Sequence, residues 1–270
     1  MKIVVCVKHV PDVQSERRFD DSRLVRGEDD VLNELDENAV EAAVSLVEDL
    51  GGEVIVLTMG DEDAEDGVRR ALQMGADSGV IVADAALEGT DVPGTATVLA
   101  RAISRIGGCT ICEDGTDCGN PLGDVDLIIT GMASLDAMTS MLPAALATVL
   151  KVPALTLANS LTVSSQDVNI TRTLGAVSQS LTAPLPAVVS VTDQANEPRY
   201  PNFAAMRAAK KKPIDVWSLQ DLGLAEEQVV ARTEVTAASQ RPERQAGTII
   251  TDAGEAGTRL AQWLRDEGLV

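Results

Sequence analysis

Three cysteines stand close together in the stretch CTICEDGTDCGN, as Cys109, Cys112 and Cys118. A C-x-x-C pair is a common beginning of a zinc or iron–sulfur site. A fourth ligand is missing nearby, because Cys6 belongs to a predicted strand much earlier in the chain. We therefore expect reduced thiols in an acidic loop and no metal, although the sequence leaves the metal question open.

His9 is the only histidine of the chain. No nucleophile or paired acid stands beside it in the sequence, so a catalytic triad is not expected. The phosphate-binding motifs G-x-G-x-x-G and G-x-x-x-x-G-K-[ST] are also absent from the sequence. We expect a protein that has no catalytic residues of its own.

Positive charge is concentrated in the segment NEPRYPNFAAMRAAKKKP, residues 196–213. The chain has a formal charge of −20 and six lysines, and three of these are consecutive in this segment. Tyr200 and Phe203 stand beside them, although aromatic residues make up only 2% of the chain. An exposed aromatic side chain flanked by cations would suit protein docking, whereas the lysines alone would equally suit a helix C-terminus.

The overall composition excludes several classes of partner. Asp and Glu number 42 against 22 Lys and Arg, and this acidity disfavours nucleic acids and anionic lipid surfaces. The sequence has no run of about 18 apolar residues that would span a membrane. The apolar run 3–7 is too short for a signal peptide, so we expect a cytoplasmic protein without membrane insertion. Acid spread along the whole chain is also typical of salt adaptation, which the sequence does not decide.

Apolar runs alternate with amphipathic stretches through the first 150 residues, and this alternation is the pattern of βαβ units. Strands are predicted at 2–10, 53–60, 78–84 and 124–132. Helices are predicted at 36–52, 61–76, 90–108 and 140–152, and the first of them is expected to be capped near Asn33 or Asp36. The fold class is therefore α/β, with an open, mainly parallel sheet and helices on both faces.

The second half of the chain has a different composition and hydrophobic pattern. Thr- and Ser-rich alternating segments at 155–163, 169–175 and 178–182 predict antiparallel strands that extend the sheet. A fully buried strand is expected at 186–193 and a last amphipathic helix at 252–268. We expect a domain at 1–224 and, at 225–270, an arm and helix that pack on a partner chain, with a flexible tail as the alternative.

Four segments together resemble the β subunit of electron-transfer flavoproteins, including the nitrogen-fixation-associated bacterial branch. They are VCVKHVPD at 5–12, NELDENAVEAAVSL at 33–46, RRALQMGAD at 69–77 and PLPAVVSVTDQANEPRYPNFAAMRAAKKKP at 184–213. The last is the most specific, because NEPRY and KKKP follow a buried strand in the same order.

The resemblance implies an electron carrier subunit and not an enzyme. It implies a five-stranded parallel domain of the adenine-nucleotide α-hydrolase type that joins an α subunit in a heterodimer. The α subunit would hold most of the redox FAD, while this chain would bury AMP or a second FAD. The complex would take electrons from dehydrogenases, such as acyl-CoA dehydrogenases, and pass them to a quinone reductase.

The resemblance also implies which residues bind the nucleotide, at the carboxyl ends of the strands where open parallel sheets bind ligands. They are Cys6, Asn33, Glu34, Leu35, Asp36, Met59, Gly131, Met132, Ala133, Ser134, Leu135, Asp136 and Thr139. The loop GMASLDAMTSML at 131–142 departs from the family pattern G-x-Q-x-x-D-x-D-x-x-Q-T and keeps only Asp136 of its acids. Its methionines are more typical of core or interface packing than of a nucleotide contact. Nothing in the loop selects between AMP and a second FAD, and AMP is the first expectation.

The resemblance makes the segment from 196 onward the loop and helix that dock the dehydrogenase, with Phe203 at the position of the family's apolar anchor. The docking residues are Asn196, Glu197, Pro198, Arg199, Tyr200, Phe203, Lys210, Lys211 and Lys212. The alternative function is a stand-alone adenine-nucleotide-binding regulator of the universal-stress-protein type. Tight ATP binding by the isolated chain, without a flavin partner, would favour that alternative.

Overall fold

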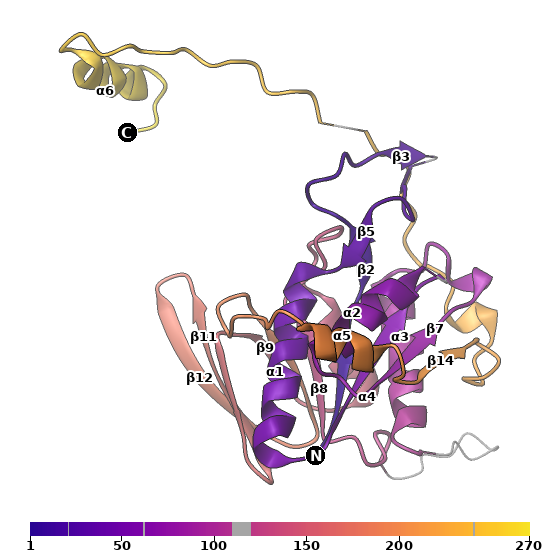
Figure 1. The fold of residues 1–270 in the computed structure, drawn as a ribbon. Coiled ribbons are helices and arrows are strands. Elements are labelled where there is room, and N and C mark those ends of the chain that lie inside the picture. The colour runs from indigo at the N-terminus through magenta and orange to yellow at the C-terminus, as the bar shows by residue number, and fades with distance from the viewer. Residues whose placement is uncertain (21, 62, 110–119, 240) are drawn as a thin grey trace. The chain divides into compact units, whose positions relative to one another are not determined.

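The computed structural model describes residues 1–270 except 21, 62, 110–119 and 240 (Figure 1). The chain forms two compact units, Met1–Thr236 and Ala237–Val270. Among the described residues, no helix has the length and apolar character needed to cross a membrane.

A seven-stranded parallel sheet forms the centre of the first unit, in the order β14-β7-β6-β1-β8-β13-β9. Its strands are β1 (Lys2–Cys6), β6 (Glu53–Met59), β7 (Ser78–Val82), β8 (Leu127–Gly131), β9 (Ala154–Ala158), β13 (Ala187–Val191) and β14 (Ile214–Trp217). In the centre of the sheet, Val4 lies opposite Ile55 on one side and Ile128 on the other. Strands this rich in Val, Leu and Ile are typical of a parallel sheet buried on both faces.

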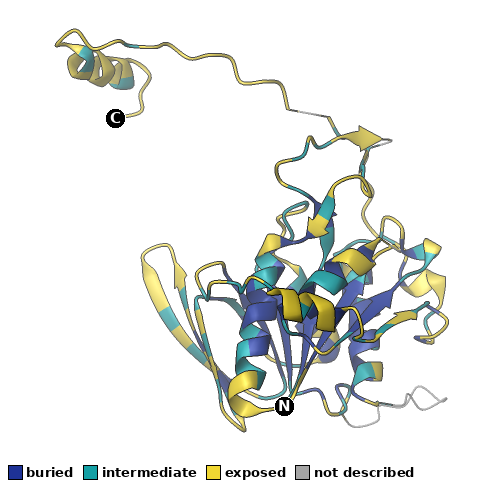
Figure 2. Cartoon of the chain, viewed as in Figure 1, coloured by how far each residue is buried: buried dark blue, intermediate teal, exposed yellow. Residues whose placement is uncertain are grey.

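Helices cover both faces of this sheet, which confirms the predicted fold class. The helices of the first unit are α1 (Glu34–Leu50), α2 (Ala64–Met74), α3 (Val92–Ile106), α4 (Leu142–Leu150) and α5 (Phe203–Ala209). Side chains alternate along β1, so that Ile3 and Val5 belong to the core layer that includes residues of α1, α2 and α5, while Val4 and Cys6 belong to the layer that includes residues of α3 and α4. Figure 2 shows the buried strands between these helices.

The ends of the helices follow from local sequence. Asp91 caps α3, because its carboxylate accepts a hydrogen bond of 3.1 Å from the backbone N–H of Gly94. Three acids stand in the first turn of α1, where they complement the helix dipole. The helix ends at Gly51, whose φ of 76° is in the left-handed region that favours glycine.

The antiparallel strands form a sheet of their own and do not extend the parallel one, so this expectation was wrong. The small sheet has the order β10-β11-β12, with β10 at Ser160–Val163, β11 at Asp167–Leu174 and β12 at Val177–Pro184. The predicted strand 155–163 is divided, because β9 pairs in parallel with β13 and the chain then passes into β10. Leu157, with φ of 62°, marks the irregular end of β9. Alternation of apolar and polar residues shows which face of a strand is buried, but it does not show which other strand pairs with it.

Several short elements were not predicted as such, and the predicted strand 2–10 is divided, because it ends at Cys6 and resumes at His9 in a separate ribbon. Strand β14 adds an edge to the sheet, and two ribbons pair β2 (His9–Pro11) with β5 (Asp30–Leu32) and β3 (Phe19–Asp20) with β4 (Arg23–Leu24). The sheet thus has seven parallel strands where the resemblance implied five. Short 3₁₀ turns, η1 and η2, cover Ala85–Leu87 and Glu226–Gln228.

The second unit contains α6 (Ala256–Asp266), and no residue of this helix is buried. Leu260 and Trp263 of α6 are about half exposed. The first unit continues beyond the predicted boundary at 224, because Val229 is buried in its core. The predicted packing of the arm on a partner chain stays a prediction.

The difference in burial between inner and edge strands of the sheet predicts where substitutions cost most stability. Ile129 of β8 is fully buried, whereas Val216 of the edge strand β14 is 63% exposed. We expect Ile129→Ala to lower the free energy of unfolding by about 2–5 kcal/mol, because it leaves a cavity in the core. The control Val216→Ala should change it by less than about 0.5 kcal/mol. Urea unfolding of the two variants measures this, and equal losses would contradict the assignment of the core.

Candidate functional site

Asn33 joins two loops at the carboxyl edge of the sheet. It occupies the N-cap position of α1, but its side chain makes no capping hydrogen bond. Instead its amide donates to the carbonyl of Ala133 at 2.9 Å and accepts from the backbone N–H of Leu135 at 3.0 Å. The residue is fully buried, so these bonds hold the loop after β8 against the start of α1.

Asp36 makes a second connection at the same edge. Its carboxylate accepts hydrogen bonds from the backbone N–H groups of Lys8 at 2.8 Å and Gly131 at 3.2 Å. A Cβ at Gly131 would lie 2.4 Å from this carboxylate, so only glycine fits so close to α1. Burial raises the pKa of Asp36 to about 7, although hydrogen bonds from its neighbours oppose that rise.

Asp136 lies with two cations beyond the end of β8. Its carboxylate accepts from Lys8 Nζ at 2.7 Å and also pairs with Arg26, and its side chain is only 3% exposed. Burial would raise the pKa of Asp136, but the charges and hydrogen bonds of these neighbours outweigh it and lower the pKa to about 2. Its Oδ1 is buried without a hydrogen-bond partner among the described residues.

The remaining predicted nucleotide residues differ in their surroundings. Cys6 is buried at the end of β1, and burial together with the Asp36 carboxylate raises the pKa of its thiol to about 12, so it is not a reactive thiolate. Glu34 and Thr139 are exposed, and Met59 at the end of β6 is half-buried. The residues that the structure brings into direct contact are Asn33, Asp36, Gly131, Ala133 and Leu135. Met132, Ser134 and Asp136 belong to the same loop.

The two other candidates for chemistry have no support from geometry. Within the described residues, no group of three or more His, Cys, Asp or Glu is arranged to hold a metal ion. Cys109 is half-buried, while Cys112 and Cys118 lie outside the described residues. The His9 ring packs close to Gly67 of α2, and its Nε2 is buried without a partner in the described part of the chain.

The predicted docking segment presents two aromatic side chains to solvent. Tyr200 is 91% exposed and Phe203, the first residue of α5, is 84% exposed. Asn202 caps α5 by accepting a 2.9 Å hydrogen bond from the backbone N–H of Ala205. Lys210 and Lys211 are also exposed. Aromatic and basic side chains in one exposed stretch have the composition of a protein-binding surface.

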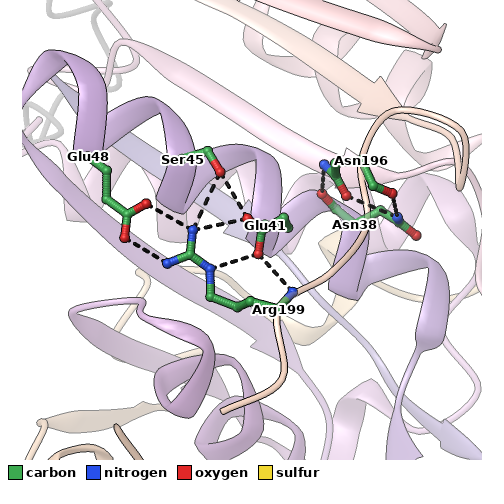
Figure 3. A network of polar contacts seen from close by, with 6 residues as sticks. All are labelled: Asn38, Glu41, Ser45, Glu48, Asn196 and Arg199. Carbon is green, nitrogen blue, oxygen red and sulfur yellow. Dashed lines mark hydrogen bonds and ion pairs between the residues drawn. The ribbon is translucent and has the colours of Figure 1, made fainter. Parts of the chain in front are cut away.

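Other predicted docking residues point inward and bind α1 (Figure 3). The Arg199 guanidinium pairs with Glu41 at 2.8 Å and with Glu48 at 2.7 Å. Asn38 and Asn196 exchange hydrogen bonds of 3.0 and 2.9 Å through their side-chain amides and backbone carbonyls. Arg199 and Asn196 therefore hold the segment on the protein, and their polar groups are not free for a partner.

Lys212 also binds inward. Its Nζ donates to the carbonyls of Leu72, Gly75 and Ala76, which end α2. The prediction that lysines of this segment serve a helix C-terminus thus applies to Lys212, although the helix is α2 and not α5. Lys210 and Lys211 are the lysines of the cluster that are exposed.

Sequence reasoning missed the acceptors of Arg199. Asn38, Glu41, Ser45 and Glu48 are spaced by three or four residues and so lie along one face of α1 (Figure 3). This spacing was a usable signal for a polar helix face. It did not reveal the partner, since Glu41 and Arg199 are 158 residues apart in the sequence.

An open parallel sheet with helices on both faces and polar loops at its carboxyl edge places this protein in the α/β class that binds ligands at that edge. The model of the electron transfer flavoprotein domain matches residues 23–222. The chain is 36% identical over 273 residues to the electron transfer flavoprotein subunit beta of Mycobacterium leprae, and the match covers 97% of each chain.

Two further relatives come from different systems. Protein FixA of Rhizobium meliloti is 33% identical over 232 residues, which cover 84% of this chain and 75% of FixA. The caffeyl-CoA reductase-Etf complex subunit CarD of Acetobacterium woodii is 28% identical over 279 residues, with 100% of both chains covered. The chain belongs to the electron transfer flavoprotein family, whose members are flavin-associated electron carriers and not enzymes. The predicted resemblance to β subunits is thereby confirmed.

The raised pKa of Asp36 predicts a pH dependence of stability. The ordinary pKa is 3.8 and the folded value is about 7, so this carboxyl stabilises the fold fully below pH 3.8 and loses that contribution as pH rises through about 7. Relative to Asp36→Asn, the free energy of unfolding of the native protein should fall between about pH 4 and pH 7, by at most about 4 kcal/mol.

Urea unfolding at several pH values measures this difference. Asp215→Asn is the control, because Asp215 is exposed on the edge strand β14. Its curve should run parallel to that of the native protein. A curve for Asp36→Asn that is also parallel would show that Asp36 ionises normally in the fold.

Proposed function

We propose that this chain is an electron-transfer flavoprotein β subunit that forms an FAD-containing heterodimer with an α subunit. The complex takes electrons from dehydrogenases, such as acyl-CoA dehydrogenases, and passes them to a quinone reductase. Family membership and the match to a β subunit over nearly its whole length support the proposal. The unburied helix α6 supports the further proposal that the second unit, residues 237–270, packs on the α subunit, because Leu260 and Trp263 of this helix are about half exposed.

The observation that carries the proposed docking role is the exposure of Phe203 on an otherwise anionic protein. Insertion of one aromatic ring into a pocket of a partner supplies much of the binding energy of a small interface. The exposed Lys210 and Lys211 would steer the encounter and set its orientation.

We also propose that a nucleotide binds at the carboxyl edge of the sheet. The cations of Lys8 and Arg26, whose side chains are 40% and 35% exposed beside the buried Asp136, suit a phosphate. The exposed Met138 and Met141 offer an apolar surface for an aromatic ring system. These residues fit an adenine nucleotide, with AMP as the first choice and a second FAD as the alternative. Bound FAD would supply the reversible uptake of electrons.

The content of the native complex tests the proposed cofactors. We expect the chain to copurify with an α subunit, and mass spectrometry of the released nucleotides to find one FAD and one AMP per heterodimer. Asp136→Ala should lower the AMP content and leave the FAD content unchanged. If two FAD molecules and no AMP are released, the nucleotide at this edge is a second FAD and not AMP. A colourless monomer would contradict the proposed function.

Removal of the aromatic anchor tests the docking role. We expect Phe203→Ala to lower the second-order rate of flavin reduction by an acyl-CoA dehydrogenase about tenfold, which corresponds to about 1.4 kcal/mol, near the low end of the free energy gained by burying a Phe side chain on docking. Flavin content should not change, since the ring is exposed. The control Val216→Ala removes an exposed apolar side chain elsewhere and should keep the native rate. Equal rates for Phe203→Ala and the native complex would remove the docking role.

A further inference from the structure

The docking segment is fastened to the protein on both sides of its exposed residues. On the upstream side, Arg199 and Asn196 bind α1 (Figure 3). On the downstream side, Lys212 binds the carbonyls at the end of α2, and Arg69 Nη1 donates to the carbonyl of Ala209 at 3.0 Å. Residues 200–208 thus form a short stretch between two attached ends, with Tyr200 and Phe203 exposed within it.

Arg199 makes the largest set of contacts at the upstream point. Its Nη1 and Nη2 donate to the two carboxylate oxygens of Glu48 at 2.7 and 2.9 Å, which is a bidentate pair. Its Nε and Nη2 donate to the two oxygens of Glu41 at 2.8 and 3.0 Å. The backbone N–H of Arg199 donates to the same carboxylate at 3.0 Å. Both the side chain and the backbone of this residue are therefore fixed to α1.

The electrostatic setting favours this arrangement. Burial would raise the pKa of Glu41, but hydrogen bonds from Arg199 and Ser45 outweigh it, so the pKa lies below the usual range. Hydrogen bonds from Arg199 also lower the pKa of Glu48. Both carboxylates are accordingly ionised at neutral pH. The Arg199 guanidinium lies between them and donates charge-assisted hydrogen bonds to both. An isolated surface ion pair would contribute much less order.

The exposed aromatic residues follow directly after this fastened residue. Tyr200 is the next residue in the chain and Phe203 stands three positions further, at the start of a capped helix. A side chain that is already held in its binding orientation loses less conformational freedom on docking. If Arg199 lost these contacts, the backbone at residue 199 would become more mobile, and the orientations of the Tyr200 and Phe203 rings would vary more.

We propose that Arg199 is a positioning residue that holds Tyr200 and Phe203 in their docking orientation before the partner arrives, without contacting the partner itself. The inference rests on the proposed docking role of Phe203. It assigns Glu41 and Glu48 of α1 to the same task, as the acceptors that keep Arg199 in place. The partner then needs to supply a pocket for an aromatic ring, but no carboxylate for Arg199.

The test compares Arg199→Gln with Arg70→Gln in the intact heterodimer. Arg70 makes a similar ion pair from α2 to α1, at 2.8 Å from Glu37, and its side chain is 33% exposed against 32% for Arg199. We expect amide hydrogen exchange over residues 197–205 to become at least tenfold faster in Arg199→Gln and to stay native in Arg70→Gln. Equal exchange in both variants would overturn the inference.

Kinetics separates positioning from direct contact. With an acyl-CoA dehydrogenase and its acyl-CoA substrate as the probe, Phe203→Ala and Arg199→Gln should each lower the rate of flavin reduction about tenfold. The double variant should be slowed about 10–20-fold and not about 100-fold, because both changes remove the same presented ring. A 100-fold loss would mean that Arg199 acts independently of Phe203, and the positioning role would fail.

The outcomes distinguish this inference from the proposed function. If Phe203→Ala keeps the native rate, the docking role itself fails. If Phe203→Ala is slow while Arg199→Gln keeps the native rate, only the positioning role fails. Glu48→Gln serves as a milder second variant if Arg199→Gln impairs folding, since Glu48 is 58% exposed and removal of its charge leaves Glu41 in place. It should accelerate exchange over the same residues, and native exchange would again overturn the inference.

Discussion

The packing of helix α1 against the parallel sheet is the constraint on which both candidate sites depend. Its inner residues, Ala39, Val40 and Ala43, are fully buried against the strands. The start of the helix carries Asn33 and Asp36, which tie the loops after β1 and β8 together. Because a buried helix does not shift without opening the core, these loops have a fixed position relative to the sheet.

The outer face of the same helix supports the docking segment. Glu41 and Glu48 accept from Arg199, and Asn38 binds Asn196 (Figure 3). One rigid element therefore sets the position of the proposed nucleotide edge and of the proposed docking residues. Electron transfer between proteins needs reproducible geometry, and support from a buried helix provides it without a large interface.

The strongly acidic composition gives each cation near these sites a separate task. Lys8 and Arg26 neutralise the buried Asp136. Arg199 and Lys212 fasten the two sides of the docking segment. Lys210 and Lys211 are exposed. In a chain of charge −20, exposed lysines beside aromatic rings form a local region of opposite sign, which in the proposed docking role would orient an approaching partner more than it stabilises the fold.

The sequence by itself determined the parallel α/β core, the position of its loops and the exposure of the docking segment. Val- and Ile-rich runs between amphipathic stretches contain that information locally, because burial of a strand on both faces leaves a continuous apolar run. The tertiary structure alone decided that β10, β11 and β12 form a separate sheet, since alternation does not identify a neighbouring strand. The tertiary structure also decided which charged side chains of the docking segment bind the protein itself and which are exposed. Arg199 and Lys212 find their acceptors 158 and 140 residues away, and the local sequence contains no record of which distant groups the fold brings within hydrogen-bond distance.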